Sequence, residues 1–348
     1  MNATPKETKD VSNIEYFGDP IYTYSLRQGI SDGFLAPYKV VRIGLDKDLE
    51  GWRPEKGKTD KYGYEIEDRE YNLTDYDRNL ILEKRTELVA AKVTEFLKAT
   101  DRFAKTIVFC ENVDHAERMR QALVNANPDL AAANKRYVMR ITGDNDEGKA
   151  QLDNFIDPES TFPVIATTSQ LMSTGVDAQT CHLIVLDKRI NSMTEFKQII
   201  GRGTRINEDY NKLFFTIMDF RRATALFADP AFDGDPVQIY EPKLTDPVVP
   251  PEIDPYSGSH ANEDSAAYAE GLDGPEADPT ASTARPSKYV VGDVEVTVAT
   301  ERVQYLDADG RLMTESLKDY TRKMLRKEYR SLTAFLTAWK DADRKQAI

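Results

Sequence analysis

From Arg78 to Phe220, short continuous runs of apolar residues alternate with segments whose apolar residues recur every three or four positions. Such runs are typical of strands buried on both faces, and such periodic segments are typical of helices with one buried face. The predicted strands are TIVFC, YVMRIT, PVIATT, HLIVLD and LFFTIMD. The predicted helices are ILEKRTELVAAKVTEFLKA, DHAERMRQALVNA (ended by Asn127-Pro128), KAQLDNFI and MTEFKQII. The alternation predicts an α/β fold, with a parallel sheet covered by helices on both faces.

An earlier run, YKVVRIGL, is a candidate for a further strand of the same sheet. Parallel sheets usually bind ligands at the carboxyl ends of their strands. The residues that directly follow each predicted strand are therefore candidates for a functional site.

The composition is that of a globular protein, and 348 residues predict more than one domain. No run approaches the 18 apolar residues of a membrane span, and the first ten residues lack the pattern of a secretory signal. Cys110 and Cys181 lie in apolar runs without metal-ligand spacing, so we expect reduced, buried thiols in a cytoplasmic protein and no metal site. The net charge of −13 argues against a nucleic-acid-binding protein. This indication is weak because the acids are unevenly distributed: residues 245–284 alone hold nine acids and no Lys or Arg.

Three further segments have distinct compositions. Residues 46–77 are charged and aromatic with little periodicity, which predicts an inserted surface loop. Residues 241–287 are rich in Pro, Asp, Ala, Ser and Gly, which predicts a flexible acidic linker. Residues 288–315 alternate around Asp307-Ala308-Asp309-Gly310, which predicts a β-hairpin. Helices are predicted after it, one of them with an apolar stripe that contains Phe335 and Trp339.

Two glycine-rich stretches resemble phosphate-binding loops, and both fail on chemical grounds. Gly51 to Thr59 ends in GKT, but its spacing is one residue too long and Pro54 removes a backbone donor. Gly143 to Ala150 has the required spacing, but Ala150 lacks the hydroxyl that would bind Mg²⁺. This second stretch also carries three acids, which would repel phosphate. We therefore predict no phosphate loop in this chain.

The segment FKQIIGRGTRI, Phe196 to Ile206, places two arginines three residues apart between glycines. Ser192 and Glu195 form a predicted capping box, and Met193, Phe196 and Ile200 form the buried stripe of the helix that it starts. In a continuous helix Gln198, Arg202 and Arg205 share another face, where guanidinium groups are suited to phosphate. Gly201 and Gly203 predict a close approach by another backbone or a ligand. The alternative is that both arginines pair with acids of their own domain.

Four of these stretches, taken in order, resemble motifs IV to VI of superfamily-two helicases. They are IVFC (107–110), TGDNDEGK (142–149), ATTSQLMSTGVDAQT (166–180) and QIIGRGTR (198–205). NATPK (2–6) resembles the end of motif III, and residues 16–38 resemble the crossing between motor domains in the R (HsdR-type) subunit of type I restriction enzymes. The hairpin and LKDYTRKMLRKEY resemble the start of the helical domain of that subunit.

The resemblance implies a domain map. Residues 1–37 would be the end of motor domain 1 and the crossover, and residues 38–240 a RecA-like motor domain 2 that contains the 46–77 insertion. Residues 241–287 would be the linker, and residues 288–348 the hairpin and the start of the helical domain.

The resemblance also implies roles for individual residues. Arg205 resembles the arginine finger and Arg202 a γ-phosphate contact, and Gln198 would orient them. Gly175 and Asp177 would lie at the nucleotide cleft. Thr167 and Thr168 resemble contacts to the DNA backbone, with strand-end capping as an equal alternative. Asn112, Thr142 and Gly143 are weaker candidates for DNA contacts.

By this resemblance the whole protein would be an ATP-dependent translocase and endonuclease, with ATP and Mg²⁺ as cofactors. The Mg²⁺ would be held by a first motor domain that this chain lacks, so we expect a fragment that does not hydrolyse ATP alone. The implied partners are double-stranded DNA, the modification and specificity subunits, and the first motor and nuclease domains. The alternatives are another superfamily-two DNA or RNA helicase and a non-catalytic interaction module.

Overall fold

The computed structural model describes residues 24–299, except residues 145, 173–175, 177, 228–235, 243–245 and 251–287, together with four strands outside that range. The predicted C-terminal helices and most of residues 1–23 lie outside the described residues. In the described part, no helix is long and apolar enough to span a membrane.

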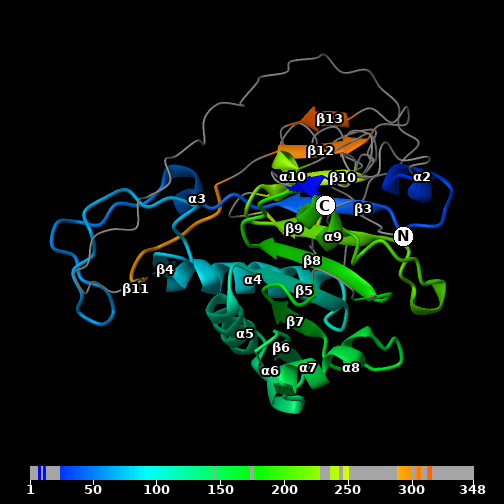
Figure 1. Ribbon diagram of the computed structural model, residues 1–348, viewed down its shortest axis with the longest axis horizontal. Helices are drawn as coiled ribbons and strands as arrows, with labels where there is room; N and C mark the ends of the chain where they lie inside the picture. Colours follow the sequence, from blue (N-terminus) through cyan, green and yellow to red (C-terminus); the bar gives the residue numbers. More distant parts are fainter. Residues whose placement is uncertain are drawn as a thin grey trace, which may run out of the picture.

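Seven neighbouring strands of a nine-stranded sheet are parallel (Figure 1), in the order β10-β3-β9-β8-β5-β7-β6, and β6 is one edge of the sheet. They are β3 (Tyr38–Arg42), β5 (Lys105–Cys110), β6 (Val138–Arg140), β7 (Ile165–Thr168), β8 (Cys181–Asp187), β9 (Phe215–Asp219) and β10 (Gln238–Glu241). The six strands expected from the apolar runs are confirmed. The seventh, β10, was not predicted from the sequence.

Helices lie between these strands, as the alternating pattern predicts, and one further helix precedes β3. They are α2 (Leu26–Ser31), α3 (Asp46–Glu50), α4 (Glu83–Ala99), α5 (Val113–Ala126), α6 (Pro128–Ala133), α7 (Asp146–Ala150), α8 (Leu152–Ile156), α9 (Met193–Ile200) and α10 (Ala223–Leu226). The single helix expected over KAQLDNFI is instead two short helices, α7 and α8, with Gln151 between them.

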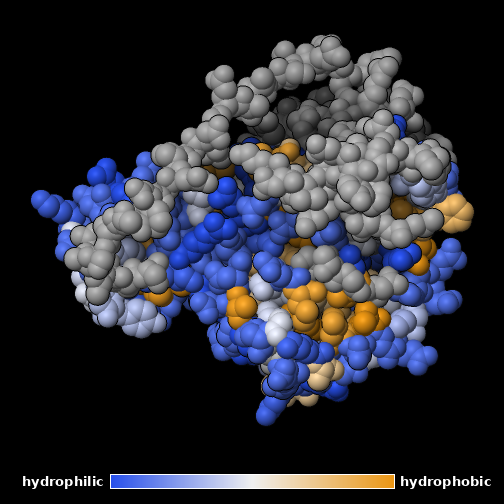
Figure 2. Space-filling view, in the orientation of Figure 1, coloured by the Kyte–Doolittle hydropathy of each residue, from blue (hydrophilic) through white to orange (hydrophobic). Residues whose placement is uncertain are grey.

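Alternate residues of each central strand enter two separate cores, one on each face of the sheet. On β5, Val108 and Cys110 pack with the apolar faces of α4 and α5. Ile107 and Phe109 pack on the opposite face with apolar residues of α8 and α9. Burial of each Val, Ile or Phe side chain stabilises the fold by about 1.5–3 kcal/mol relative to an exposed side chain. Figure 2 shows one face of the molecule, largely hydrophilic, with an apolar patch in the region of β7 and α8.

The predicted C-terminal hairpin is confirmed as the strands β12 (Arg302–Leu306) and β13 (Leu312–Glu315). β12 pairs antiparallel with β10 and so extends the main sheet. The apolar run before it behaves differently, because β11 (Tyr289–Val291) pairs in parallel with β4 (Leu80–Leu82) in a separate small sheet. Near the N-terminus β1 (Glu7–Thr8) and β2 (Val11–Ser12) form an antiparallel pair.

The sequence predicts that residues 46–77 form a surface loop, but in the structure this segment also contributes to the core. Tyr71 and Tyr76 are fully buried, Ile66 is nearly so, and all three belong to the core on the α4 side. Residues 52 and 71 pair as an isolated antiparallel bridge, which folds the segment back on itself. The segment therefore contributes to the core through its aromatic residues.

The first described residues of the predicted linker also pack against the domain. Val248 is 1% exposed, and its backbone N–H donates to Glu95 on α4 at 3.3 Å. The hydroxyl of Tyr240 donates to the carbonyl of Pro247 at 2.8 Å. The expectation that flexibility begins at residue 241 is therefore wrong, and residues 251–287 lie outside the described residues.

Candidate functional site

The helix that leads to the two arginines begins at a side-chain cap. The hydroxyl of Ser192 accepts from the backbone N–H of Glu195 at 3.1 Å, which confirms half of the predicted capping box. The other half is wrong, because the carboxylate of Glu195 accepts from the N–H of Asn191 and not from that of Ser192. The same carboxylate forms an ion pair with Lys188 at 2.6 Å. Phe196 and Ile200 are buried as predicted, with Met193 half-buried beside them.

Helix α9 ends at Ile200, so Gln198, Arg202 and Arg205 do not lie on one helical face. Gly201 caps the helix, and the chain turns over residues 201–203. Beyond the turn Arg205 lies in extended backbone, bridged to Leu35, and the N–H of Ala36 donates to the carbonyl of Thr204 at 2.7 Å. The prediction of a shared face is wrong because it required a continuous helix.

We call residues 201–206 the arginine segment. It lies beside the entry to β3 and against the first residue of β9, so it is at the amino ends of these parallel strands. The sequence predicts ligand sites at the carboxyl ends of the strands. The arginine segment is therefore on the edge of the sheet opposite to the one where ligand sites were expected.

Gly203 is required by close packing with the domain's own core. A Cβ atom at this position would lie 2.2 Å from the Phe215 ring, which is fully buried at the start of β9. At Gly201 a Cβ would lie 3.1 Å from a backbone oxygen of Lys197, which is a less severe contact. The close neighbour at Gly203 is thus an aromatic side chain, and not the backbone or ligand that the sequence suggested.

The two arginines differ in exposure and partners. Arg202 is half-buried; its Nε donates to the carbonyl of Gln198 at 3.0 Å, and its Nη1 donates to the carbonyl of Val176. Arg205 is exposed. Gln198 contacts Arg202 through its main-chain carbonyl. Gly175 and Asp177 lie outside the described residues, and of the three residues 175–177 only Val176 has a described contact with Arg202.

The residues expected to contact DNA lie at the carboxyl ends of the strands, and the side chains of Thr167 and Asn112 have structural partners there. The side chains of Thr167 and Thr168 are fully buried, and the Thr167 hydroxyl donates to the carbonyl of Ala116 at 2.9 Å. The Thr168 hydroxyl has no hydrogen-bond partner among the described residues. A DNA phosphate would reach either side chain only after local movement of the chain.

The three weaker DNA candidates, Asn112, Thr142 and Gly143, also differ in burial and in hydrogen bonding. Asn112 caps α5 by accepting from the N–H of His115 at 2.9 Å, and its amide donates to the carbonyl of Asp77 at 2.8 Å. Thr142 is fully buried. Gly143 is exposed, and a Cβ atom at this position would have no neighbouring atom within 4 Å. Of the five candidates, Gly143 is exposed and Asn112 is half-buried, whereas the three threonines are fully buried.

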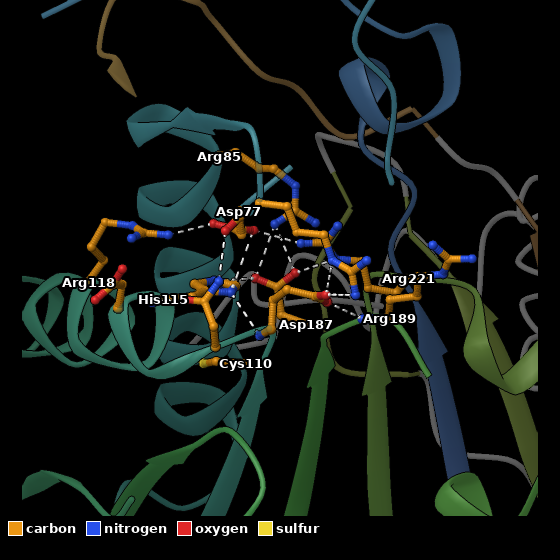
Figure 3. A network of polar contacts seen from close by, with 12 residues as sticks. Asp77, Arg85, Cys110, His115, Arg118, Asp187, Arg189 and Arg221 are labelled. Carbon is orange, nitrogen blue, oxygen red and sulfur yellow. Dashed lines mark hydrogen bonds and ion pairs between the residues drawn. The ribbon is translucent and has the colours of Figure 1, made fainter. Parts of the chain in front are cut away.

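A buried network of charges at the same carboxyl edge was not predicted from the sequence (Figure 3). Asp187, the last residue of β8, pairs with Arg85 at 2.8 Å, with Arg221 at 3.0 Å and with His115 at 3.3 Å. Asp77 pairs with Arg221 at 2.7 Å and with His115 at 3.5 Å. All five side chains are at most 5% exposed.

Opposite charges outweigh desolvation in this network. Burial alone would raise the pKa of Asp187, but the Arg85 and Arg221 guanidinium groups hold that pKa well below its usual range. Burial opposes the ionised form of Asp77 too, and the charges of His115 and Arg221 lower its pKa. The pKa of Arg85 is raised although its burial acts against it, chiefly because of Asp187 and Asp48. The network therefore has a structural role, because its ion pairs join α4, the 46–77 segment and the carboxyl ends of β8 and β9.

Neither phosphate-loop candidate has the geometry of a nucleotide site. Lys58 forms an ion pair with Asp293 at 2.8 Å, and Thr59 pairs with Glu65 in an isolated bridge. Lys149 pairs with Asp146 of its own short helix at 3.3 Å. Within the described ranges, there is also no group of three or more His, Cys, Asp or Glu side chains that could hold a metal ion.

Comparison with known proteins identifies relatives along the whole chain. A model of the helicase conserved C-terminal domain matches residues 88–207. The chain is 55% identical over 362 aligned positions to the EcoAI endonuclease subunit of a type I restriction enzyme from Escherichia coli, with 100% of this chain and 45% of that subunit covered. It is 28% identical over 238 positions to the EcoKI endonuclease subunit from Escherichia coli strain K12, with 63% of this chain and 19% of that subunit covered.

A solved structure gives the same assignment. The fold matches a fragment assigned as the HsdR subunit of a type I restriction enzyme from Vibrio vulnificus YJ016, with a TM-score of 0.55 and 48% identity. The match covers 66% of this chain and 40% of that one. Together with the parallel sheet, these matches confirm the RecA-like fold of a helicase C-terminal domain. The chain spans less than half the length of the relatives that it matches.

Proposed function

From the premise that the chain belongs with the endonuclease subunits of type I restriction enzymes, we propose that it acts as the second motor domain of an ATP-dependent DNA translocase. The whole chain aligns with one segment of the EcoAI subunit. The observation that carries the proposal is the position of Arg205. Its side chain is exposed on backbone that is fixed by the bridge to Leu35 and by the bond from Ala36 to Thr204. An arginine presented in this way can enter a nucleotide site of a neighbouring domain.

The residues of the arginine segment fit the phosphate end of ATP. A guanidinium is a planar, permanently charged donor that suits phosphate oxygens. Arg205 would contact the γ-phosphate as an arginine finger, and Arg202, held by the carbonyls of Gln198 and Val176, would support it. ATP supplies the free energy that drives movement along DNA. The described residues offer no acid cluster for Mg²⁺, so we assign the metal to acids of the first motor domain.

The carboxyl edge would contact the sugar-phosphate backbone of double-stranded DNA. Gly143 is exposed there, and the hydroxyl of Thr168, which has no partner among the described residues, is available to a phosphate after local movement. Backbone contacts of this kind position a protein without reading sequence. Recognition of the target sequence would therefore belong to the specificity subunit, and DNA cleavage to a nuclease domain, in an assembly that also holds the modification subunit in the cytoplasm.

The test uses the full-length endonuclease subunit that contains this segment, assembled with its modification and specificity subunits. Arg205→Ala should lower DNA-stimulated ATP hydrolysis by about 10³–10⁵-fold, the usual effect of an arginine finger. Arg136→Ala, which removes an exposed arginine before β6, is the matched control and should leave the rate unchanged. An Arg205→Ala rate equal to the wild-type rate would favour a non-catalytic interaction module.

The isolated chain gives an independent check. Because the proposal assigns the phosphate loop and the Mg²⁺ ligands to another domain, the purified chain should show no ATP hydrolysis with or without DNA. Turnover by the purified chain that Arg205→Ala abolishes would contradict this division of the site.

A further inference from the structure

Lys212 is a fully buried lysine that lies against the arginine segment. The chain leaves that segment at Asn207, passes through a short 3₁₀ helix at Glu208–Tyr210 and returns at Lys212. Asn207 and Lys212 exchange backbone hydrogen bonds of 3.0 and 2.9 Å, and Asn211 takes the left-handed conformation at φ 53°. The turn therefore directs the lysine side chain back toward residues that precede it.

The ammonium group of Lys212 holds two carbonyls of the arginine segment. Nζ donates to the carbonyl of Gly203 at 2.5 Å and to the carbonyl of Arg205 at 2.5 Å. The intervening carbonyl, that of Thr204, accepts from the N–H of Ala36 on the other side. Three consecutive peptide groups are thus fixed, two of them by a single side chain.

Holding a charge at this position has an energetic cost. Among the described residues the ammonium has carbonyl partners and no carboxylate partner, and burial lowers the pKa of Lys212 to about 8. The groups that face it are the Phe215 ring, with its centroid 5.4 Å from Nζ, and Cys181 and His182 at the start of β8. Burial raises the pKa of the Cys181 thiol to about 11, so this thiol is neutral near pH 7. The two hydrogen bonds from Nζ to the arginine segment offset part of this cost.

We propose that Lys212 is a positioning residue for the arginine segment, and that its ammonium group fixes the backbone around Thr204 so that Arg205 leaves the sheet edge in one direction. The inference rests on the proposed role of Arg205 in ATP hydrolysis. A misplacement of about 1 Å in a catalytic group can lower a rate by about 10²-fold. A change at Lys212 should therefore lower the rate although Lys212 itself touches no nucleotide.

The first test is Lys212→Met in the assembled full-length enzyme. This change keeps most of the side-chain volume and leaves both carbonyls without their donor. We expect kcat for DNA-stimulated ATP hydrolysis to fall by about 10–100-fold with little change in KM for ATP. Lys105→Met is the matched control, because Lys105 is also buried, donates to the carbonyl of Pro163 at 2.7 Å and has a pKa lowered to about 8 by burial. The control should keep kcat within about twofold.

The second test asks whether Lys212 acts through Arg205. The double variant Lys212→Met/Arg205→Ala should have the same kcat as Arg205→Ala alone, because the segment then has no finger to position. Losses that multiply in the double variant would overturn the inference. So would a Lys212→Met enzyme with the kcat of the Lys105→Met control, while Arg205→Ala alone remains impaired. An Arg205→Ala enzyme with full activity would overturn the inference and the proposed function together.

If Lys212→Met does not fold, the dependence of kcat on pH tests the same inference. Deprotonation converts charge-assisted hydrogen bonds into neutral ones of roughly half the strength. The wild-type kcat should therefore fall as the pH rises through about 8. The residual activity of Arg205→Ala should lack this step. A step of equal size in both enzymes, or none in the wild type, would overturn the inference.

Discussion

Arg85 and Asp187 form a buried ion pair, with Nη1 2.8 Å from Oδ1 and both side chains at most 2% exposed. Arg85 lies in the first turn of α4, and Asp187 ends the central strand β8. The same guanidinium holds Asp48 of α3 through Nε and Nη2, each at 2.9 Å. One side chain therefore joins the 46–77 segment, a long helix and the middle of the sheet.

Removing this guanidinium should strongly destabilise the domain. Arg85→Met leaves two buried carboxylates without a main partner, and breaking a buried pair from one side costs about 3–5 kcal/mol. Urea denaturation followed by circular dichroism measures the change in the free energy of unfolding. The control is Lys84→Met, which removes a surface pair with Glu87 and should cost less than about 0.5 kcal/mol. Equal stabilities for the two variants would show that the buried pair contributes no more than a surface pair.

The buried carboxylates should make the domain sensitive to acid. The pKa values of Asp77 and Asp187 are lower in the folded protein than in an unfolded chain, where aspartate titrates near pH 3.9. Their contribution is therefore complete above that pH and is lost as the pH falls below about 4 toward the folded values. Urea midpoints at pH 7, 5, 4 and 3 should show the main loss between the last two.

Asp77→Asn isolates one carboxylate in that titration. Asp77 has φ 67°, a conformation that asparagine tolerates, so the backbone should be preserved. The variant should be less stable at pH 7 and should lose less stability than the wild type between pH 4 and pH 3. An unchanged slope in this interval would mean that Asp77 does not contribute to the acid sensitivity.

Gly203→Ala should destabilise the domain and disturb the arginine segment. The new Cβ would meet the buried Phe215 ring at 2.2 Å, and such overpacking costs about 1–3 kcal/mol. Thermal unfolding of the purified chain measures the effect. Gly143→Ala is the comparison, because a Cβ there has open space and should change stability by less than about 0.5 kcal/mol. Similar melting temperatures for the two variants would contradict the close contact at Gly203.

Most of the sheet could be predicted because its strands and helices have distinct periodicities. The runs TIVFC and HLIVLD became β5 and β8, and the two long amphipathic segments became α4 and α5. β10 was not predicted, because QIYE is a short strand that directly precedes the Pro- and Asp-rich stretch. Its place in the sheet depends on pairing with β3 and β12, which are far away in the chain.

The candidate site was predictable in its residues and not in its geometry. Arg202 and Arg205 could be identified from their spacing, but their predicted shared face requires a helix that continues past Gly201, where α9 ends. The roles of Lys212 and Phe215 depend on the return of the chain to the arginine segment, which periodicity cannot show. The charge network could not be predicted either, because nothing in the sequence around Asp77, Arg85 and Asp187 indicates which residues they pair with.

Two tyrosines of the 46–77 segment test whether its packing is part of the fold. The hydroxyl of Tyr76 donates to the carbonyl of Lys47 at 2.8 Å, so Tyr76→Phe should cost about 1 kcal/mol through the lost hydrogen bond. The hydroxyl of Tyr71 is buried without a partner in the described part of the chain, so Tyr71→Phe should be neutral or slightly stabilising. Urea denaturation of both variants gives the comparison. Equal losses would contradict the different environments of the two hydroxyls, and no change in either would place the segment outside the cooperative unit.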